Sequence, residues 1–108
     1  HIYTIMGLDA YIFSNPKPKQ ERYWRKNHEL NEFMREEWEK QNPDFDKEFN
    51  LERLHLTDAV LNRLADKVRE GELGYSDLEQ RTNLLNDILI YKDDIDCNST
   101  EYFYTCWY

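Results

Sequence analysis

The stretch that most constrains the fold is EYFYTCWY, residues 101–108, in which five of the eight side chains are aromatic. Alternation along a strand assigns these side chains to two faces. One face receives Tyr102, Tyr104, Cys106 and Tyr108, and the other receives Phe103, Thr105 and Trp107. Only a sheet offers neighbours to both faces, so this stretch is expected to be a strand whose partner lies elsewhere in the chain.

Residues 2–13, IYTIMGLDAYIF, supply that partner. They are rich in β-branched and aromatic types, which suit a half-buried strand, and Gly7 is expected to form a bulge or bend. A chain of 108 residues fits one domain with one core. The sequence therefore predicts a single α+β domain over residues 1–108. Its small sheet pairs the N- and C-terminal strands and packs against one long and two shorter amphipathic helices.

The long helix is predicted over residues 19–40. Its start follows a proline-containing break at residues 14–18, and its end precedes Pro43. An apolar stripe at helical spacing forms its inner face: Tyr23, Leu30, Met34 and Trp38, with Trp24 and Phe33 on the flanks. Four carboxylates at spacings of 3, 4 and 3 follow the solvent face: Glu29, Glu32, Glu36 and Glu39.

The two shorter helices are predicted from their capping residues. Residues 44–56 fit either a short strand or the start of a helix. Thr57 is a suitable N-cap for a helix that ends near Glu70, before Gly71. The capping-box pattern at residues 76–79 starts the last helix. Its core stripe is expected to contain Leu78, Leu85, Ile88 and Leu89, and the polar residues 92–100 are expected to form a hydrated connection.

The chain is strongly acidic, with 22 Asp and Glu residues against 14 Lys and Arg residues and a net charge of −8. Such a surface repels membranes and duplex nucleic acid and favours a basic partner. Because no apolar run approaches the roughly 18 residues of a membrane span and no leader pattern is present, a cytoplasmic protein is expected. Two cysteines, Cys97 and Cys106, form neither a metal quartet nor a disulfide framework and are expected to be reduced.

Carboxylates are the first candidates for partner binding. A line of them can imitate phosphates and bind a basic protein surface, whereas the alternative is an ordinary hydrated helix face. The principal candidates are Glu29, Glu32, Glu36 and Glu39, and the secondary candidates are Asp93, Asp94 and Asp96.

A basic, aromatic cluster near residue 20 is the second candidate. Basic residues at the start of a helix oppose the helix dipole, so helix stability does not explain them. They suggest a phosphate- or nucleic-acid-binding module in which a ring stacks on a base, with ion pairing to the acidic regions as the alternative. The candidate residues are Lys19, Arg22, Trp24, Arg25 and Lys26.

Metal and catalytic patterns are weak. His28 and Glu29 resemble the start of a zinc-protease helix, but the second histidine position holds Glu32, so a small metal-dependent enzyme is only a further alternative. Asp94 and Asp96 alternate as in a calcium loop without the glycine and glutamate that such a loop needs. Neither a nucleophile with a base nor a phosphate-binding glycine loop is evident, so no cofactor and no enzymatic activity are expected.

Four short motifs stand out in the chain: MGLDAYI at 6–12, YWRK at 23–26, DLE at 77–79 and EYFY at 101–104 with Trp107. Together they resemble a family of small uncharacterised proteins of tailed phages and prophages. Members of that family begin with Met-Gly-Leu-Asp, continue with Tyr-Trp-Arg-Lys and close on an aromatic strand. This chain departs by having Ala10 where methionine is usual and by five residues that precede Met6.

This resemblance implies a phage accessory protein that acts in the host cytoplasm, and it transfers no catalytic residues. Combined with the acidity, it suggests an inhibitor of a host defence system, of the anti-restriction or anti-CRISPR type, that docks on a basic surface of a host protein.

Overall fold

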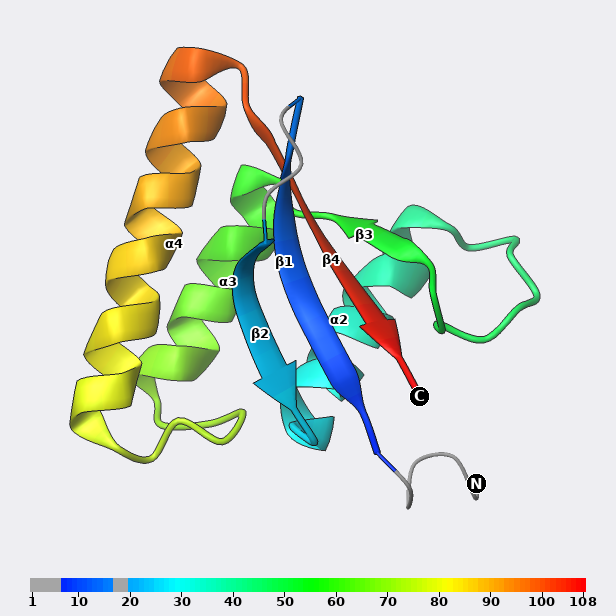
Figure 1. Ribbon diagram of the computed structural model, residues 1–108, viewed down its shortest axis with the longest axis horizontal. Helices are drawn as coiled ribbons and strands as arrows, with labels where there is room; N and C mark the ends of the chain where they lie inside the picture. The colour runs from blue at the N-terminus through cyan, green and yellow to red at the C-terminus, as the bar shows by residue number, and fades with distance from the viewer. Residues whose placement is uncertain (1–6, 17–19) are drawn as a thin grey trace.

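The computed structural model describes residues 7–16 and 20–108. The elements within these ranges are β1 (Asp9–Asn15), β2 (Gln20–Arg25), α2 (His28–Gln41), β3 (Arg53–His55), α3 (Asp58–Arg69), α4 (Leu78–Asn98) and β4 (Glu101–Trp107). Figure 1 shows the strands as one sheet with the helices behind it.

The sheet pairs the two strands that the sequence analysis joined. Its strand order is β2-β1-β4-β3, and every pair is antiparallel. Asp9 lies opposite Trp107 and Asn15 lies opposite Glu101, so β1 and β4 pair along their whole length. The predicted pairing is confirmed, although residues 2–6 of the predicted strand lie outside the described residues. The irregularity expected at Gly7 lies instead between Ile12 and Phe13, where the β1–β2 register shifts.

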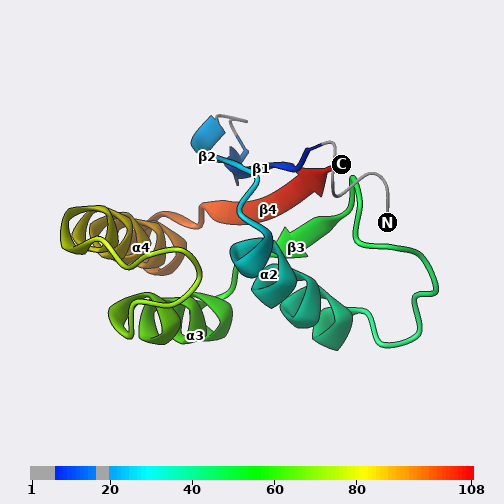
Figure 2. The ribbon, with the colours of Figure 1, turned by 90° about the horizontal axis from the view of Figure 1, so that it is seen from below.

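Helices cover one face of the sheet. Tyr102, Tyr104 and Cys106 of β4, which the alternation had placed on one face, are buried against them. The same face receives Ile12 from β1 and Leu54 from β3, which are also buried. In Figure 2 the three helices lie below the strands, and none of them lies on the opposite face. The described residues therefore form a two-layer α+β arrangement, and no helix among them covers the second face of the sheet, called here the open face.

The predicted helix over residues 19–40 is wrong in its first part. Residues 20–25 form β2, and α2 begins only at His28. Lys26 adopts a left-handed φ of 59°, and the Asn27 side chain accepts a hydrogen bond from the Leu30 amide as the N-cap. Tyr23 and Trp24 suit a strand, and pairing with β1 outweighs their match to the helical stripe. Arg22, Trp24 and Arg25 of the basic cluster therefore lie on a strand, and only Lys26 adjoins the N-cap of α2.

The middle of the chain follows the prediction. Residues 53–55 form the short strand β3, which resolves the ambiguity of residues 44–56. The Thr57 side chain accepts from the Val60 amide and caps α3, and Gly71 follows its C-cap with a φ of 78°. Helix α2 ends at Gln41, before Pro43, as predicted.

Helix α4, and not the first helix, is the long one. It has 21 residues against 14 in α2 and continues through the polar segment that was expected to be a loop. Its N-cap is Asp77, one residue after the predicted Ser76. Leu78 and Leu89, which were assigned to the core, are exposed. The buried stripe is Leu84, Ile88 and Tyr91, and Ile95 packs against the core. Tyr91 and Ile95 keep one side of the helix in contact with the core through the polar segment.

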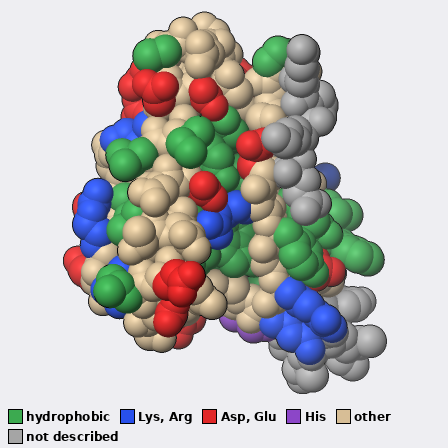
Figure 3. Space-filling model, turned by 60° about the vertical axis from the view of Figure 1, so that its left-hand side comes forward, with side chains coloured by type: hydrophobic (Ala, Val, Ile, Leu, Met, Phe, Trp, Pro, Cys, Tyr) green, Lys and Arg blue, Asp and Glu red, His purple; other side chains and the backbone are tan. Residues whose placement is uncertain are grey.

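The outer side of α4 carries Leu78, Leu89 and Ile90 as exposed apolar residues. Figure 3 views the flank of the molecule that carries α4, where hydrophobic side chains occur in separate groups among charged ones. They form no continuous apolar stripe on this flank. No helix within the described ranges is long and apolar enough to span a bilayer.

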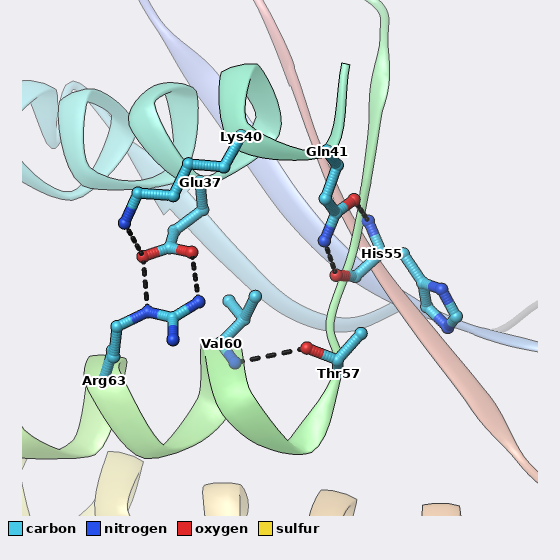
Figure 4. A network of polar contacts seen from close by, with 7 residues as sticks. All are labelled: Glu37, Lys40, Gln41, His55, Thr57, Val60 and Arg63. Carbon is cyan, nitrogen blue, oxygen red and sulfur yellow. Dashed lines mark hydrogen bonds and ion pairs between the residues drawn. The ribbon is translucent and has the colours of Figure 1, made fainter. Parts of the chain in front are cut away.

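A buried carboxylate ties α2 to α3 (Figure 4). Glu37 is 3% exposed and accepts two hydrogen bonds from Arg63, at 2.8 Å from Nε and 2.7 Å from Nη2. Lys40 adds a third contact at 3.3 Å. The hydrogen bonds from Arg63 lower the pKa of the Glu37 carboxyl below its ordinary value of 4.5. In the same view, the Gln41 side chain makes two hydrogen bonds with the His55 backbone, which ties α2 to β3.

Replacing Arg63 by Met should destabilise the domain at pH 7 by about 1–2 kcal/mol, because Glu37 then loses its bidentate partner while it stays buried. This range is modest because Arg63 is about half exposed and water screens the pair. A lowered folded-state pKa stabilises the fold above the unfolded-state pKa, and this contribution is lost as pH falls through the folded-state pKa. Urea unfolding at pH 7 and pH 3 should show the difference from wild type shrinking at the lower pH.

The matched control is Arg69→Met on the same helix. Arg69 pairs with Asp66 at 2.9 Å, but both side chains are exposed, so its loss should change stability by less than about 1 kcal/mol. Equal effects of the two substitutions would contradict the role assigned to Glu37.

Candidate functional site

The predicted carboxylate line borders a groove between α2 and the turn after α3. Glu29, Glu32, Glu36 and Glu39 are all exposed on α2, as predicted. The first three line the groove, which has a volume of about 790 Å³, whereas Glu39 is not among its lining residues. The opposite wall comes from α3 and the turn that follows it. We call this hollow the acidic groove, and its lining residues are His28, Glu29, Glu32, Phe33, Glu36, Lys67, Gly71, Glu72 and Leu73.

Two cations already neutralise part of this charge. Arg35 donates to Glu32 and, at 2.7 Å, to Glu39. Its hydrogen bonds lower the pKa of the Glu32 carboxyl below its ordinary value. Lys67 lies 3.6 Å from Glu72 across the other wall. Glu29 and Glu36 have no such partner among the described residues, so the groove keeps a negative surplus.

The secondary acidic candidates lie elsewhere. Asp93, Asp94 and Asp96 occupy the last turns of α4 and not a loop. Asp94 accepts from the Tyr102 hydroxyl at 2.6 Å and from Asn98 at 3.0 Å, so it joins α4 to β4. A hydrogen bond with Asp58 raises the pKa of the Asp96 carboxyl. None of the three lines the acidic groove.

The predicted basic cluster is divided between the two faces of the sheet, because alternate residues of a strand point in opposite directions. Arg22 points toward the helices and pairs with Asp87 at 2.7 Å. Trp24 is 8% exposed and donates from Nε1 to the Tyr75 hydroxyl at 2.7 Å, so its ring belongs to the core and offers no face to a base. Arg25 and Lys26 are exposed at the end of β2, and Lys19 lies outside the described residues.

The metal-ligand candidate His28 does not join a cluster of ligands in the part of the chain that the structure describes. His28 is exposed at the start of α2 and lines the acidic groove. Within residues 7–16 and 20–108, no group of three or more His, Cys, Asp or Glu side chains is placed to hold an ion. Cys97 is exposed and Cys106 is buried, and both are free thiols. Burial raises the pKa of the Cys106 thiol to about 12.

The open face of the sheet carries aromatic side chains that the sequence analysis did not single out. Tyr23 and Trp107 are 46% and 57% exposed. Phe13 stacks on Phe103 at 5.5 Å, and His55 stacks on the other side of Phe103 at 5.1 Å. We call this surface the ring face, and its rings are Tyr11, Phe13, Tyr23, His55, Phe103 and Trp107.

One signal for the ring face was present in the sequence. The alternation had placed Phe103, Thr105 and Trp107 together on the second face of the last strand. The sequence does not show which sheet face the helices cover, and both faces of this strand are apolar enough to be the inner one. Which face becomes the inner one is determined by buried residues on other elements, such as Leu30 and Ile88, that share its core.

Comparison of the chain with protein-family models, with curated proteins and with solved structures finds no match. The two candidate binding surfaces of the chain are therefore the acidic groove and the ring face.

Proposed function

We propose that this chain is an accessory protein of a phage or prophage that binds a host protein through the acidic groove and inhibits it by occlusion. The observation that carries the proposal is the convergence of Glu29, Glu32 and Glu36 with Glu72, from a separate segment, around one hollow. Carboxylates from two elements make a concave anionic surface, which a single helix face does not provide. The resemblance to phage proteins supplies the biological setting.

The partner is expected to offer a basic helix or loop with at least one apolar side chain. Lys67 and His28 are the basic residues of the lining, so a lysine- or arginine-rich segment meets a surplus of carboxylates. Phe33 and Leu73 also line the groove and can contact an apolar side chain of the partner. Attraction between the carboxylates of the groove and a basic partner accelerates their association. Added salt screens this attraction and should lower the association rate.

The test is affinity capture from host lysate with three baits. The groove variant carries Glu29→Lys, Glu32→Lys and Glu36→Lys. The control variant carries Asp44→Lys, Asp46→Lys and Glu48→Lys, which changes the net charge equally in an exposed loop outside the groove. Wild type and control should retain the same partner, whereas the groove variant should bind it at least about tenfold more slowly.

Thermal melts of all three baits check folding, since the groove variant loses the Glu32–Arg35 contact. If a folded groove variant captured the partner as fast as wild type, the acidic groove would not be the binding surface.

A further inference from the structure

The side chains of the ring face lie in three rows across the sheet. In the first row, Asp9 of β1 lies opposite both Arg25 and Trp107. In the second, Tyr11 lies between Tyr23 and Thr105, and Thr105 lies opposite Arg53. The third contains Phe13, Phe103 and His55. Each of the first two rows therefore combines an aromatic ring with an arginine.

These two arginines differ from all the others in the chain. Arg22, Arg35, Arg63 and Arg69 form ion pairs, and Arg81 donates to the carbonyl oxygens of residues 75 and 76. Arg25 and Arg53 make neither kind of contact with the described residues, and the Arg53 guanidinium lies 5.0 Å from the centre of the Phe103 ring. In a chain with a net charge of −8, two unpaired arginines on one face point to an anionic ligand.

The carboxylates of the ring face do not compete for these arginines. Asp9 accepts a hydrogen bond from the Tyr23 hydroxyl at 2.6 Å. Glu101 lies at the far end of β4, opposite Asn15, whose amide is 3.4 Å away. The ring face is thus electrically balanced, whereas the acidic surplus of α2, α3 and α4 lies in the other layer (Figure 2). At physiological salt, charges more than about 8 Å apart are largely screened, so the helical layer repels a ligand on the ring face only weakly.

Three rings have a surface available for a further planar group. Trp107 is exposed near the end of β4, and Tyr23 is exposed on the edge strand β2. His55 ends the row of stacked rings on the opposite edge strand β3. The exposed rings of this face can stack on planar groups of a ligand, and the arginines between them can bind its anionic groups. A matching ligand therefore carries several planar groups that are joined by anions. Single-stranded nucleic acid has this chemistry, while the paired bases of a duplex present no free faces.

We propose that the ring face binds single-stranded nucleic acid, with bases stacked on Trp107, Tyr23 and His55 and backbone phosphates held by Arg25 and Arg53. This role moves the predicted phosphate site from the helix start to the sheet. It keeps Arg25 and replaces the buried Trp24 by Trp107 as the stacking ring. It goes beyond the proposed function and does not depend on the acidic groove.

The test is a fluorescence-anisotropy titration of labelled dT12 and rU12 single strands and of a 12-base-pair DNA duplex, each at two salt concentrations. Wild type should bind a single strand with a dissociation constant of about 1–100 µM at physiological salt and should bind the duplex more weakly. Trp107→Ala should weaken single-strand binding about 5- to 150-fold. Arg25→Gln with Arg53→Gln should reduce the salt slope by about 1.4.

The control variant carries Arg69→Gln on α3 and Lys92→Gln on α4, which removes two charges from the other layer and should leave binding unchanged. The difference between dT12 and rU12 identifies DNA or RNA as the preferred strand. An absence of binding to both strands would overturn the proposal, and so would binding that Trp107→Ala leaves intact. Equal affinity for the duplex, or for a 12-residue oligoglutamate that represents an acidic protein segment, would also overturn it. The groove variant described above should bind dT12 at least as well as wild type, so this proposal and the proposed function fail independently.

Discussion

Deletion of residues 101–108 should unfold the entire domain. These residues form β4, an inner strand that pairs with both β1 and β3. Tyr102, Tyr104 and Cys106 leave the core with it, and removal of one buried aromatic side chain alone costs about 3–5 kcal/mol. Because domains of this size have a total stability of about 5–15 kcal/mol, no cooperative fold should survive.

Far-ultraviolet circular dichroism and a thermal melt measure this outcome. The control is Trp107→Ala in the full chain, which alters an exposed side chain of the same strand and should shift stability by no more than about 0.5 kcal/mol. A truncated monomer that melted at the wild-type temperature would show that β4 is not an integral strand.

Substitution of Tyr104 by Ala should be the most damaging single change, at about 3–5 kcal/mol. The side chain is fully buried, and its ring lies 6.0 Å from that of Phe49 and 6.1 Å from that of Trp24. Its hydroxyl donates to the Asn31 side chain at 2.7 Å and so links β4 to α2.

Tyr104→Phe removes the hydroxyl and keeps the ring, so it measures the contribution of the hydroxyl to stability. It leaves the buried Asn31 oxygen without its donor and should cost about 1–2 kcal/mol. Urea unfolding should show a lower midpoint with an unchanged slope for Phe and a larger drop for Ala. Equal losses for the two variants would mean that the ring contributes little, contrary to its place in the core.

The last strand could be predicted because its signal is local. Alternation in residues 101–108 places Tyr102, Tyr104 and Cys106 together on one face whatever the rest of the chain does, but it does not say which of the two faces is the inner one. The start of α2 could not be predicted from local sequence, because it depends on contacts with distant residues. Tyr23 fits the helical stripe as well as it fits a strand, and what excludes the helix is pairing with β1 and the contact between Arg22 and Asp87.

The length of α4 was underestimated because polar composition was taken as a sign of a loop. Tyr91 is buried and Ile95 packs against the core, and these two contacts hold the polar segment against the domain as a helix. The helix ends where Ser99 adopts a left-handed conformation with a φ of 54°. A non-glycine residue in this region is rare, so the sequence carried little indication of the end.

The candidate sites were predictable to different degrees. The exposure of Glu29, Glu32 and Glu36 followed from helical spacing, whereas the opposite wall at Glu72 depends on how α3 and its turn pack. The basic cluster was recognised as unusual, but the ring assigned to stacking within it, Trp24, is buried in the core. The ring face depends on which side of the sheet the helices cover, and this is a property of the assembled domain.

The most direct test of the account is acrylamide quenching of tryptophan fluorescence, which measures whether the ring face is uncovered in solution. Trp24 and Trp38 are buried, whereas Trp107 is 57% exposed. The account predicts that one of the three tryptophans is readily quenched in wild type and that Trp107→Phe removes the quenchable emission. Quenching that is equally weak before and after Trp107→Phe would show that the ring face is covered, and would contradict the account.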